Sequence, residues 1–519
     1  MKKYHSIFND VLGPIMTGPS SSHTAGCARI GKMIRILYGN DIEEAEIIFE
    51  KNGSYPSTYK GQGTDYGFVG GLLGFSPNDI RLKHALKIAE ESNLKITFKS
   101  EDLGMNHPNE AEIRIYRNKK LDMKVITRST GGGTFEIINM DDFDISITGE
   151  NKKIYISTKE NSLIQEIKKI ISPNHYYLQK KNNTILLEIL IINHEIENKI
   201  KYLKNDNRII FYRTAEVILP VTLNKENIPL FFNAAEAIEY NKSENLNLWE
   251  LAIKYECSIS NISKNDVVEK MKNILFFMKK SLLIDIDNKN TEFQILSNNS
   301  AKIENKLKNE NIIDMGVLNK IMLSAVKTME NNCKHNIIVA APTAGSCGVI
   351  PATIVYCGEK INVEEDKIIK ALLTSGLIGV FIANQSTFSA EVAGCQAENG
   401  AASCMAAAGI IELLDGNIEE CFSAASLALQ NLLGLICDPV GGLTEVPCIS
   451  RNVLASINAV SAANMIKCGY DAVIPLDEVI TAMYEVGKML PNELKCTCKG
   501  GLCNTKTGKE IYNKIKKYS

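Results

Sequence analysis

The stretch from Gly394 to Cys448 constrains the fold of this chain more than any other. It opens with Gly394-Cys395-Gln396-Ala397-Glu398, continues through small residues to Ile411, and closes with a turn-rich segment from Gly434 to Cys448. The stretch is apolar and punctuated by Gly and Pro, yet it keeps cysteines at turn-like positions, where a thiolate can face a buried cavity. We therefore expect closely packed helices with chemistry at the turns between them.

The 519 residues leave room for two or more domains, because single cores rarely grow beyond about 250 to 300 residues. Hydrophobic residues make up 45% of the chain and charged residues 23%, which is typical of a soluble globular protein. The formal net charge of −2 gives no electrostatic argument for nucleic acid or an anionic membrane, since such partners leave a concentrated basic footprint. We expect a small-molecule substrate, no nucleic acid and no membrane.

Two segments resemble targeting or membrane sequences only superficially. The segment from Met1 to Asp10 is basic at its start but holds no apolar core of signal-peptide length. The segment from Ile337 to Cys357 is apolar, but prolines and glycines interrupt it, so a buried loop leading into a helix is expected there. These features predict a cytoplasmic protein.

The cysteines are unevenly distributed, since 12 of the 14 lie at or after Cys333. A secreted disulfide framework spreads its cysteines through small modules, whereas this skew in a large chain fits metal binding or catalysis better. Any one cysteine taken alone is most simply a small buried side chain. Cys496, Cys498 and Cys503 are candidate metal ligands, but no fourth ligand is obvious nearby.

The sequence predicts an α+β fold in three parts. Residues 1–150 hold Gly-rich turns and short strand-like runs, which indicate a mixed α/β domain. Residues 151–215 show the ferredoxin-like order βαββαβ, with strands and helices expected at 154–157, 163–171, 176–179, 184–191, 195–203 and 208–212. Residues 216–519 are expected to form an all-helical domain, and the charged run at 302–311 is expected to be a solvated helix face.

A run of polar side chains near the N-terminus is the first candidate binding loop. It reads Ser20-Ser21-Ser22-His23-Thr24, and a helical pattern follows from Ala28 to Arg35. Backbone amides and hydroxyls at a helix N-terminus form a ready site for a carboxylate or phosphate. A simple N-cap is the plain alternative, but this many polar side chains exceed what a cap needs.

Two further parts of the sequence contain candidate functional residues. The segment from Ala341 to Ala352 contains Thr343-Ala344-Gly345-Ser346 and reads as a turn running into a helix, either an anion clamp or a plain helix entry. Cys395, Cys437 and Cys448 are separated by 42 and 11 residues, which is weak evidence for a metal site because compact local pairs are the strong signal. No Walker loop, H-E-x-x-H helix or G-x-S-x-G elbow is present.

Taken together, the motifs resemble those of bacterial iron-sulfur-dependent L-serine dehydratases (L-serine ammonia-lyases). The resemblance covers roughly residues 1–145 and 315–510, with the β and α parts of that family fused in one chain. The motifs similar to the β part are Thr17 to Gly26, Tyr59 to Asp65, Asn106 to Asn109 and Gly131 to Gly133. Those similar to the α part are Ala341 to Ala352, Gly394 to Glu398, Cys437 to Asn452, Asp477-Glu478-Val479 and Gly500-Gly501-Leu502.

The resemblance implies a [4Fe-4S] cluster on three cysteines, which map to Cys395, Cys437 and Cys448. The fourth iron then lacks a protein thiolate and acts as a Lewis acid toward the substrate. L-Serine would lose water to give aminoacrylate, which hydrolyses to pyruvate and ammonia. The resemblance also implies an active site between the two parts and a homodimer.

The same resemblance implies residue roles. The expected substrate-binding residues are Ser20, Ser21, Ser22, Thr24, Thr343, Ala344, Gly345, Ser346 and Lys302. Family members generally have a histidine, regarded as a candidate base, where this chain has Gln62, and an amide cannot accept a proton at neutral pH. His23 and His107 are therefore the other candidate bases. A Gly-Gly turn of the family is replaced here by Ser297-Asn298-Asn299-Ser300.

The middle part resembles an ACT domain, but Thr158-Lys159-Glu160-Asn161 lacks the Pro-Gly of the usual ligand-binding turn, which argues against a ligand there. Other functions stay open: a diverged member acting on another β-substituted amino acid or hydroxy acid, or a catalytically weak amino-acid-sensing paralogue. A redox iron-sulfur protein is disfavoured because its clusters normally have four thiolates. A pyridoxal-phosphate enzyme needs a Schiff-base lysine beside a phosphate-binding loop, and these motifs offer none.

Overall fold

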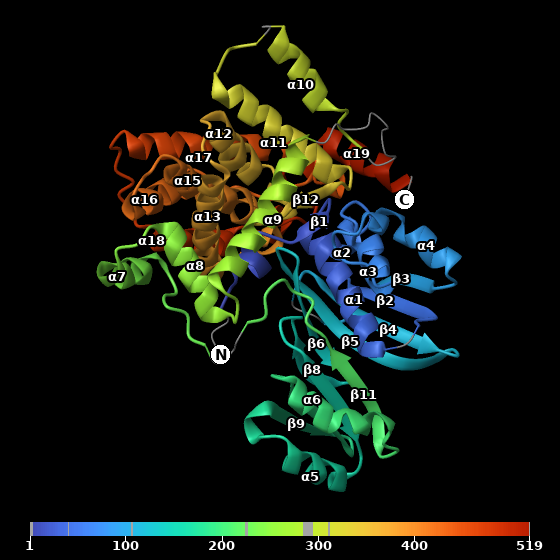
Figure 1. Ribbon diagram of the computed structural model, residues 1–519. Coiled ribbons are helices and arrows are strands. Elements are labelled where there is room, and N and C mark those ends of the chain that lie inside the picture. The colour runs from blue at the N-terminus through green and yellow to red at the C-terminus, as the bar shows by residue number, and fades with distance from the viewer. Residues whose placement is uncertain are drawn as a thin grey trace.

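The computed structural model describes residues 4–39, 41–104, 107–223, 227–283, 294–309 and 312–517. Figure 1 shows a six-stranded sheet with helices against it, a smaller sheet below, and a larger helical body beside them. This arrangement confirms the predicted α+β class. Asn106, part of one of the motifs above, lies outside the described residues.

The first sheet supports the N-terminal side of the site. Its strand order is β3-β2-β4-β5-β6-β7, with β2 and β3 parallel and all other neighbours antiparallel. Alternate residues of β5 are buried, as expected for a sheet with one face covered by helices. The strands are β2 (Glu44–Glu50), β3 (Lys95–Glu101), β4 (Glu110–Arg117), β5 (Lys120–Gly131), β6 (Thr134–Met140) and β7 (Phe143–Ile147), and the helices are α1 (Gly26–Tyr38), α2 (Tyr55–Thr58), α3 (Thr64–Leu72) and α4 (Ala85–Glu91).

Helices α1 and α3 approach each other through two glycines. A Cβ added to Gly71 would lie 2.2 Å from a backbone oxygen of α1, and one added to Gly31 would lie 2.4 Å from a backbone oxygen of α3. Only residues without a side chain fit at this contact, so the two helices are fixed closely against each other. The contact positions the site, because α1 follows the loop 20–24 and α3 follows Gln62.

The second sheet has the predicted order of elements, βαββαβ. Its strands are antiparallel in the order β11-β8-β10-β9, and Ile and Leu side chains from the strands and helices form a core of their own. The helix expected at 195–203 is divided, because α6 ends at Ile200 and a 3-10 turn follows. The elements are β8 (Lys153–Thr158), α5 (Asn161–Ile170), β9 (Tyr176–Lys181), β10 (Thr184–Leu190), α6 (His194–Ile200) and β11 (Ile209–Ala215).

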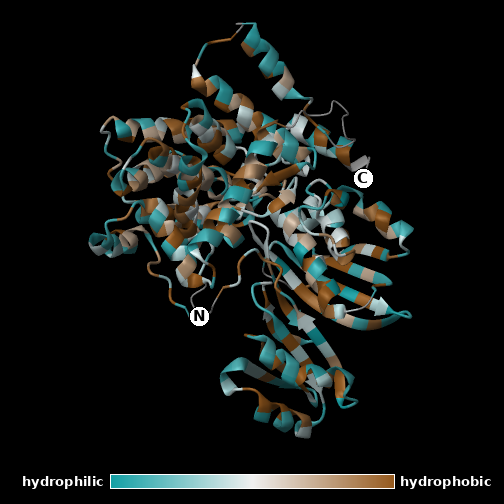
Figure 2. Ribbon diagram, in the orientation of Figure 1, coloured by the Kyte–Doolittle hydropathy of each residue, from teal (hydrophilic) through white to brown (hydrophobic). Residues whose placement is uncertain are grey.

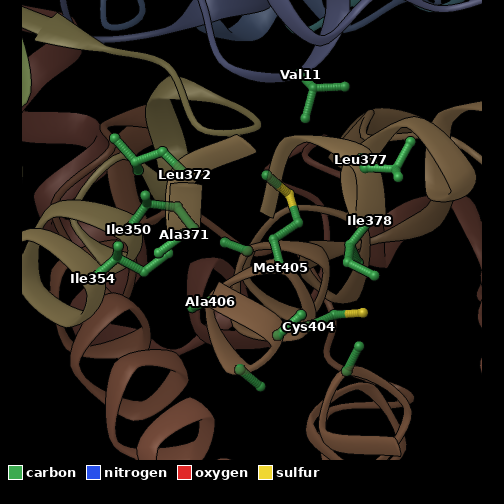
Figure 3. Close-up of a cluster of buried hydrophobic side chains, with 14 of the residues drawn as sticks. Val11, Ile350, Ile354, Ala371, Leu372, Leu377, Ile378, Cys404, Met405 and Ala406 are labelled. Carbon is green, nitrogen blue, oxygen red and sulfur yellow. The ribbon is translucent and has the colours of Figure 1, made fainter. Parts of the chain in front are cut away.

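The helical body is built around α13 and α15, whose small residues allow close packing. Figure 3 shows Ala371, Leu377, Met405 and neighbouring apolar side chains meeting in its centre. In contrast, α10 is largely hydrophilic (Figure 2), in agreement with the predicted solvated face. The helices are α7 (Ala234–Glu244), α8 (Leu248–Ile259), α9 (Lys264–Leu283), α10 (Asn299–Lys308), α11 (Val317–Cys333), α12 (Tyr356–Lys360), α13 (Glu365–Gln385), α14 (Ala390–Ala393), α15 (Asn399–Leu413), α16 (Ile418–Gln430), α17 (Cys448–Lys467), α18 (Leu476–Met489) and α19 (Lys506–Lys517).

One short strand interrupts the part that the sequence predicted to be all-helical. Strand β12 (Ile337–Val339) pairs antiparallel with β1 (Ile15–Thr17). The π-helical turn Ile7–Val11, which precedes β1, lies in the core of the helical body, and Figure 3 shows Val11 there. The first residues of the chain therefore pack with the helical body, and β1 leads from it to the loop 20–24.

Helix α13 is the one helix in the described part of the chain that is long and apolar enough to cross a membrane. Of its most apolar window, 78% is buried inside the protein. Its apolar side chains pack in the core of the helical body, so we interpret it as a core helix. The apolar segment from Ile337 to Cys357 instead forms β12 and short buried turns before α12, as the sequence predicts.

The close contact of α1 and α3 predicts that a single methyl group added at Gly71 destabilises the protein. Replacing Gly71 with Ala (Gly71→Ala) should lower the free energy of unfolding by about 1–3 kcal/mol, because the added carbon overlaps backbone that cannot move without separating the helices. Urea denaturation followed by circular dichroism measures the change.

Gly400→Ala is the matched control, since Gly400 also lies inside a helix but its added Cβ would meet only side-chain atoms, the nearest being the end of the Leu429 side chain at 3.3 Å. We expect a change below about 1 kcal/mol for this variant. Equal effects of the two substitutions would contradict the proposed role of the glycine contact.

Candidate active site

The loop Ser20-Ser21-Ser22-His23-Thr24 is a buried π-helical turn between β1 and α1. The Ser20 hydroxyl caps the turn by accepting a hydrogen bond from His23 N at 3.1 Å. All five side chains are buried, although all five are polar. Buried polar groups require partners, and those of this loop come from both sides of the molecule.

His23 is at the centre of these contacts and is fully buried. Its Nδ1 lies 3.0 Å from Ser22 Oγ and 3.4 Å from Glu391 Oε1. Its Nε2 lies 3.0 Å from Thr58 Oγ1 and 3.3 Å from Ser54 Oγ. Burial lowers the pKa of His23 to about 4 although Glu391 opposes this change, so the imidazole is neutral at neutral pH.

Glu391 brings a carboxylate from the helical body to this histidine. It lies in α14, and its two oxygens accept hydrogen bonds from Ser22 Oγ at 2.9 Å and from Ser389 Oγ at 2.8 Å. Burial by itself would raise the pKa of Glu391, but His23 and these donors hold it below its ordinary value. The Glu391 side chain is therefore an anion at neutral pH.

The two predicted binding loops meet at the same place. Ser21 Oγ accepts a hydrogen bond from Ala344 N at 3.2 Å. The Asn332 amide donates to Pro19 O at 2.8 Å and to Ala344 O at 3.1 Å, and thus joins both loops. Within its own loop, Ser346 donates to Ala341 O at 3.2 Å.

Glu398 is a second carboxyl group at the site. Its Oε1 accepts a hydrogen bond from Thr343 Oγ1 at 2.8 Å, and a Cβ on Gly345 would approach it to 2.9 Å. Burial of the carboxyl group raises the pKa of Glu398 to about 8, and the charge of Glu391 adds to this effect. Glu398 is therefore mostly protonated at neutral pH, unlike Glu391.

The three predicted cysteines come from three segments. Cys395 begins a 3-10 turn after Gly394, whose φ of 79° favours glycine. Cys437 lies in the loop after α16, and Cys448 is the first residue of α17, where a helix N-terminus stabilises a thiolate. Burial raises the pKa of Cys448, and the charge of Cys395 raises it further.

Polar groups surround the cysteines. Arg451 donates to Ile436 O and to Asp438 Oδ1, both at 2.8 Å, and its charge favours the thiolates of Cys395 and Cys448. The Asn399 amide donates to Cys395 Sγ at 3.1 Å. Burial nevertheless raises the pKa of Cys395 to about 11. The thiols must therefore lose their protons when a metal binds.

A pocket of about 470 Å³ leads to this region, and its lining includes Ser54, His107 and Glu391. Lys495, Thr497 and Lys499 also line the pocket. A pocket of this size accommodates a small amino acid. It gives such a molecule access to Glu391, which lies beside His23.

The other two predicted catalytic residues, Gln62 and His107, lie at the edge of the site. Gln62 is buried, and its amide donates to Cys496 Sγ at 3.6 Å, while its backbone oxygen accepts from Thr24 Oγ1 at 2.8 Å. His107 lies in the wall of the pocket, where its Nδ1 accepts from Asn109 N at 3.1 Å. Burial, aided by Arg128, lowers the pKa of His107.

Lys302, predicted to bind substrate, lies apart from the other predicted residues. It is exposed on α10 and donates a hydrogen bond to Ser297. The backbone amides of Asn299 and Ser300, at the start of this helix, donate to Glu330. Segment 297–300 therefore anchors α10 on α11.

Comparison with known proteins agrees with this geometry. The family model "Serine dehydratase alpha chain" matches residues 243–503, and "Serine dehydratase beta chain" matches residues 7–129. The chain belongs to the serine dehydratase family. The segments that meet at His23 and Glu391 thus match the beta and alpha chains of serine dehydratases.

The sequence of this chain is similar to several known L-serine dehydratases over long stretches. The L-serine dehydratase of Haemophilus influenzae is 27% identical over 507 residues, which cover 93% of this chain and 96% of the relative. The probable L-serine dehydratase alpha chain of Bacillus subtilis is 36% identical and covers 55% of this chain and 95% of the relative. The L-serine dehydratase alpha chain of Peptoniphilus asaccharolyticus is also 36% identical, with 54% and 96% covered.

Three charged residues of this candidate site are absent from the site residues predicted from sequence. They are Glu391, Glu398 and Arg451, and each follows or lies within an apolar, small-residue segment. Charged side chains are rarely buried unless paired, so a charge in such a segment is a usable signal. Their partners lie far away in the sequence, which is why the motifs alone did not assign them roles.

The two hydrogen bonds that the Asn332 side chain makes to the loops predict a loss of stability when this side chain is removed. Asn332→Ala should lower the free energy of unfolding by about 1–3 kcal/mol, because two buried carbonyl oxygens lose their donor. Asn431→Ala is the control, since Asn431 is exposed and donates only to Asn458. Thermal unfolding of both variants tests this, and a similar melting temperature for the two would contradict it.

Proposed function

We propose that the protein is an L-serine ammonia-lyase that converts L-serine into pyruvate and ammonia. One observation carries the proposal: the hydroxyl-rich loop of the segment matching the beta chain contacts the Glu391 carboxylate and the Ala344 backbone amide of the segment matching the alpha chain. Both halves of the site are thus present in one chain. The Haemophilus influenzae relative, named L-serine dehydratase, aligns with both halves.

The donor set near the site fits an iron-sulfur cluster. Among the described residues, no three His, Cys, Asp or Glu side chains converge on a single metal ion. A [4Fe-4S] cluster has a different requirement, because each thiolate binds its own iron and the thiolates lie around a larger group. We assign the cluster to Cys395, Cys437 and Cys448, supported by the positive charge of Arg451 and the amide donor of Asn399.

A bound cluster would supply a Lewis-acidic iron for the departure of the substrate hydroxyl. The protein supplies binding and proton transfer. We assign the substrate carboxylate to the two loops around Ser21 and Ala344, which bring hydroxyls and backbone amides together in a water-poor interior. In this arrangement Ser22 and Thr343 hold the two catalytic carboxyl groups in place.

The two proton transfers need one base and one acid. Neutral His23 has an acceptor nitrogen for the Cα proton, and Glu391 stabilises the imidazolium that forms. Protonated Glu398 is the acid that gives its proton to the departing hydroxyl, which leaves as water. The remaining aminoacrylate rearranges to an imine, and water hydrolyses this to pyruvate and ammonia.

Gln62 has a positioning role in this proposal. Its amide cannot remove a proton, and its donor side points to Cys496 Sγ. His107 borders the pocket, so we assign it to the substrate route. The homodimer and the cytoplasmic location stay predictions.

The decisive experiment is an assay of anaerobically purified protein. Iron and sulfide should be bound, and pyruvate should form from L-serine at a higher rate than from D-serine, L-threonine or L-cysteine. A cluster with no pyruvate from L-serine would favour a diverged or amino-acid-sensing protein instead. Absorbance of a pyridoxal cofactor without iron would contradict the proposal.

Variants of the cysteines test the ligand assignment. Replacement of Cys395, Cys437 or Cys448 with Ala should strongly lower the bound iron and abolish pyruvate formation. Cys404→Ala is the matched control, because Cys404 is buried, as Cys395 and Cys437 are, but lies inside α15. Iron content equal to that of the control would contradict the assignment.

The ionisation of Glu398 predicts the pH dependence. The acid must be protonated, so kcat should be lost as the pH rises through the pKa of about 8, and should be nearly constant between about pH 6 and pH 7. Burial and the charge of Glu391 raise the pKa of Glu398, while the Thr343 hydroxyl and the charge of Arg451 lower it. A profile that keeps rising beyond this range would contradict the assignment.

Glu398→Gln keeps the shape of the side chain but removes the proton, so kcat should fall by about 10²–10⁴-fold and its alkaline limb should vanish. Glu412→Gln is the control, because Glu412 is also a half-buried carboxyl group with a raised pKa. It lies near the far end of α15, roughly 20 Å away at 1.5 Å per residue. Its kcat and pH profile should match those of the unmodified protein.

A further inference from the structure

Two thiols of the C-terminal loop, Cys498 and Cys503, face the same backbone oxygen. Cys498 Sγ donates a hydrogen bond to Pro439 O at 3.5 Å, and Cys503 Sγ donates to the same oxygen at 3.0 Å. The two sulfurs are also within hydrogen-bonding reach of each other. Both thiols are free, so the fold holds two unlinked sulfurs together at one carbonyl group.

A tight turn around Asp438 brings the two sulfurs together. Gly501, which lies between the cysteines, has a φ of 58°, and a Cβ added there would lie 2.4 Å from Asp438 Oδ2. The same carboxylate oxygen accepts a hydrogen bond from Leu502 N at 2.8 Å, while Asp438 Oδ1 accepts one from Arg451. Only glycine allows the chain to pass so close to the carboxylate. The position of the thiols therefore depends on the buried Asp438 and not on their mutual contact alone.

The pair has the two properties that thiol–disulfide exchange requires, a thiolate and access from solvent. A hydrogen bond from the Cys498 thiol lowers the pKa of Cys503, because it stabilises the thiolate. Cys503 is only 6% exposed, whereas Cys498 is half-buried and partly in contact with solvent. A small oxidant can therefore reach the pair through Cys498. The two sulfurs need only a small movement to form a bond, because they are already within hydrogen-bonding reach.

The segment that contains Cys498 also lines the substrate pocket. Thr497 and Lys499, the two chain neighbours of Cys498, line this pocket together with Glu391. The sulfurs of a disulfide are about 2.0 Å apart, which is much less than the distance across a hydrogen bond between thiols. Closing the bond would draw Cys498 toward Cys503, and its two neighbours would move with it. The redox state of the pair is therefore coupled to the shape of the pocket.

We propose that Cys498 and Cys503 form a reversible disulfide that changes the wall of the substrate pocket. The oxidant is a small-molecule disulfide: one protein thiolate attacks it, forms a mixed disulfide and releases one small thiol. The other protein sulfur then attacks the mixed disulfide and releases the second small thiol, so both protein thiol protons end on the released thiols. Disulfides inside cells are usually transient and redox-sensing. Only the effect on the substrate rests on the proposed function.

Peptide mapping tests whether the bond forms. Trypsin cuts after Lys495, Lys499 and Lys506, so it separates the two cysteines. The anaerobically purified full-length protein, incubated with oxidised glutathione, should give peptide 496–499 linked to peptide 500–506 in a mass spectrum recorded without reductant. Dithiothreitol should separate the two peptides. Absence of the linked peptides would overturn the inference.

Cys496 provides the matched control, because it lies in the same tryptic peptide as Cys498, two residues away. Cys496→Ser should keep the link to peptide 500–506, whereas Cys498→Ser and Cys503→Ser should lose it. Each variant exchanges a sulfur for an oxygen, and circular dichroism shows whether the fold is kept. A link that is lost in Cys496→Ser but kept in Cys498→Ser would assign the bond to Cys496 and overturn the inference.

The KM for L-serine, measured before and after oxidation, tests the effect on the pocket. Oxidation should raise KM about 3-fold or more, with the iron content unchanged, and dithiothreitol should restore the original value. The KM of Cys503→Ser should not respond to oxidised glutathione. Linked peptides without a change in KM would overturn the effect on the pocket. No pyruvate from the reduced protein would instead contradict the proposed function, while the linked peptides would still support the disulfide.

Discussion

The buried contact between His23 and Glu391 is the interaction on which the site depends. It joins a loop of the first sheet region to the helical body, at 3.4 Å, where water does not screen the charge. Removing a partner of a buried polar group typically costs about 1–3 kcal/mol, and more for a charged group such as Glu391, because the group is left unsatisfied. Burial affects the two carboxyl groups differently: it raises the pKa of Glu398, with a further contribution from the charge of Glu391, whereas His23 and hydrogen-bond donors keep the pKa of Glu391 low.

Local features were predictable because their causes are local. The hydroxyl run at 20–24 followed by a helical pattern predicted a turn into a helix, and α1 begins at Gly26. The alternation of strand and helix patterns predicted the order of elements from β8 to β11. Small residues between glycines and prolines predicted the closely packed helical body, and α13 and α15 form its centre.

Contacts between distant segments were not predictable from the same signals. Ser22 and Glu391 are 369 residues apart, and no periodicity in the sequence records that they bond. Strand β12 has only three residues and exists because β1 pairs with it. The neighbourhood of Cys496 depends on a backbone bridge to Cys437. Lys302 is a prediction of the opposite kind, a contact that was expected but is not seen. The family resemblance predicted that it binds substrate, whereas the structure shows it exposed on α10.

The packing of the first residues in the helical body determines when the protein can fold during its synthesis. Ile7 and Val11 fit against Gly376 and Gly379 of α13, where a side chain in place of either hydrogen would collide with them. The ribosome makes these partners about 20 to 70 seconds apart at ordinary elongation rates. The segment that precedes the loop 20–24 therefore leaves the ribosome long before its packing site exists. Assembly of the catalytic centre is consequently a late event that waits for the second half of the polypeptide.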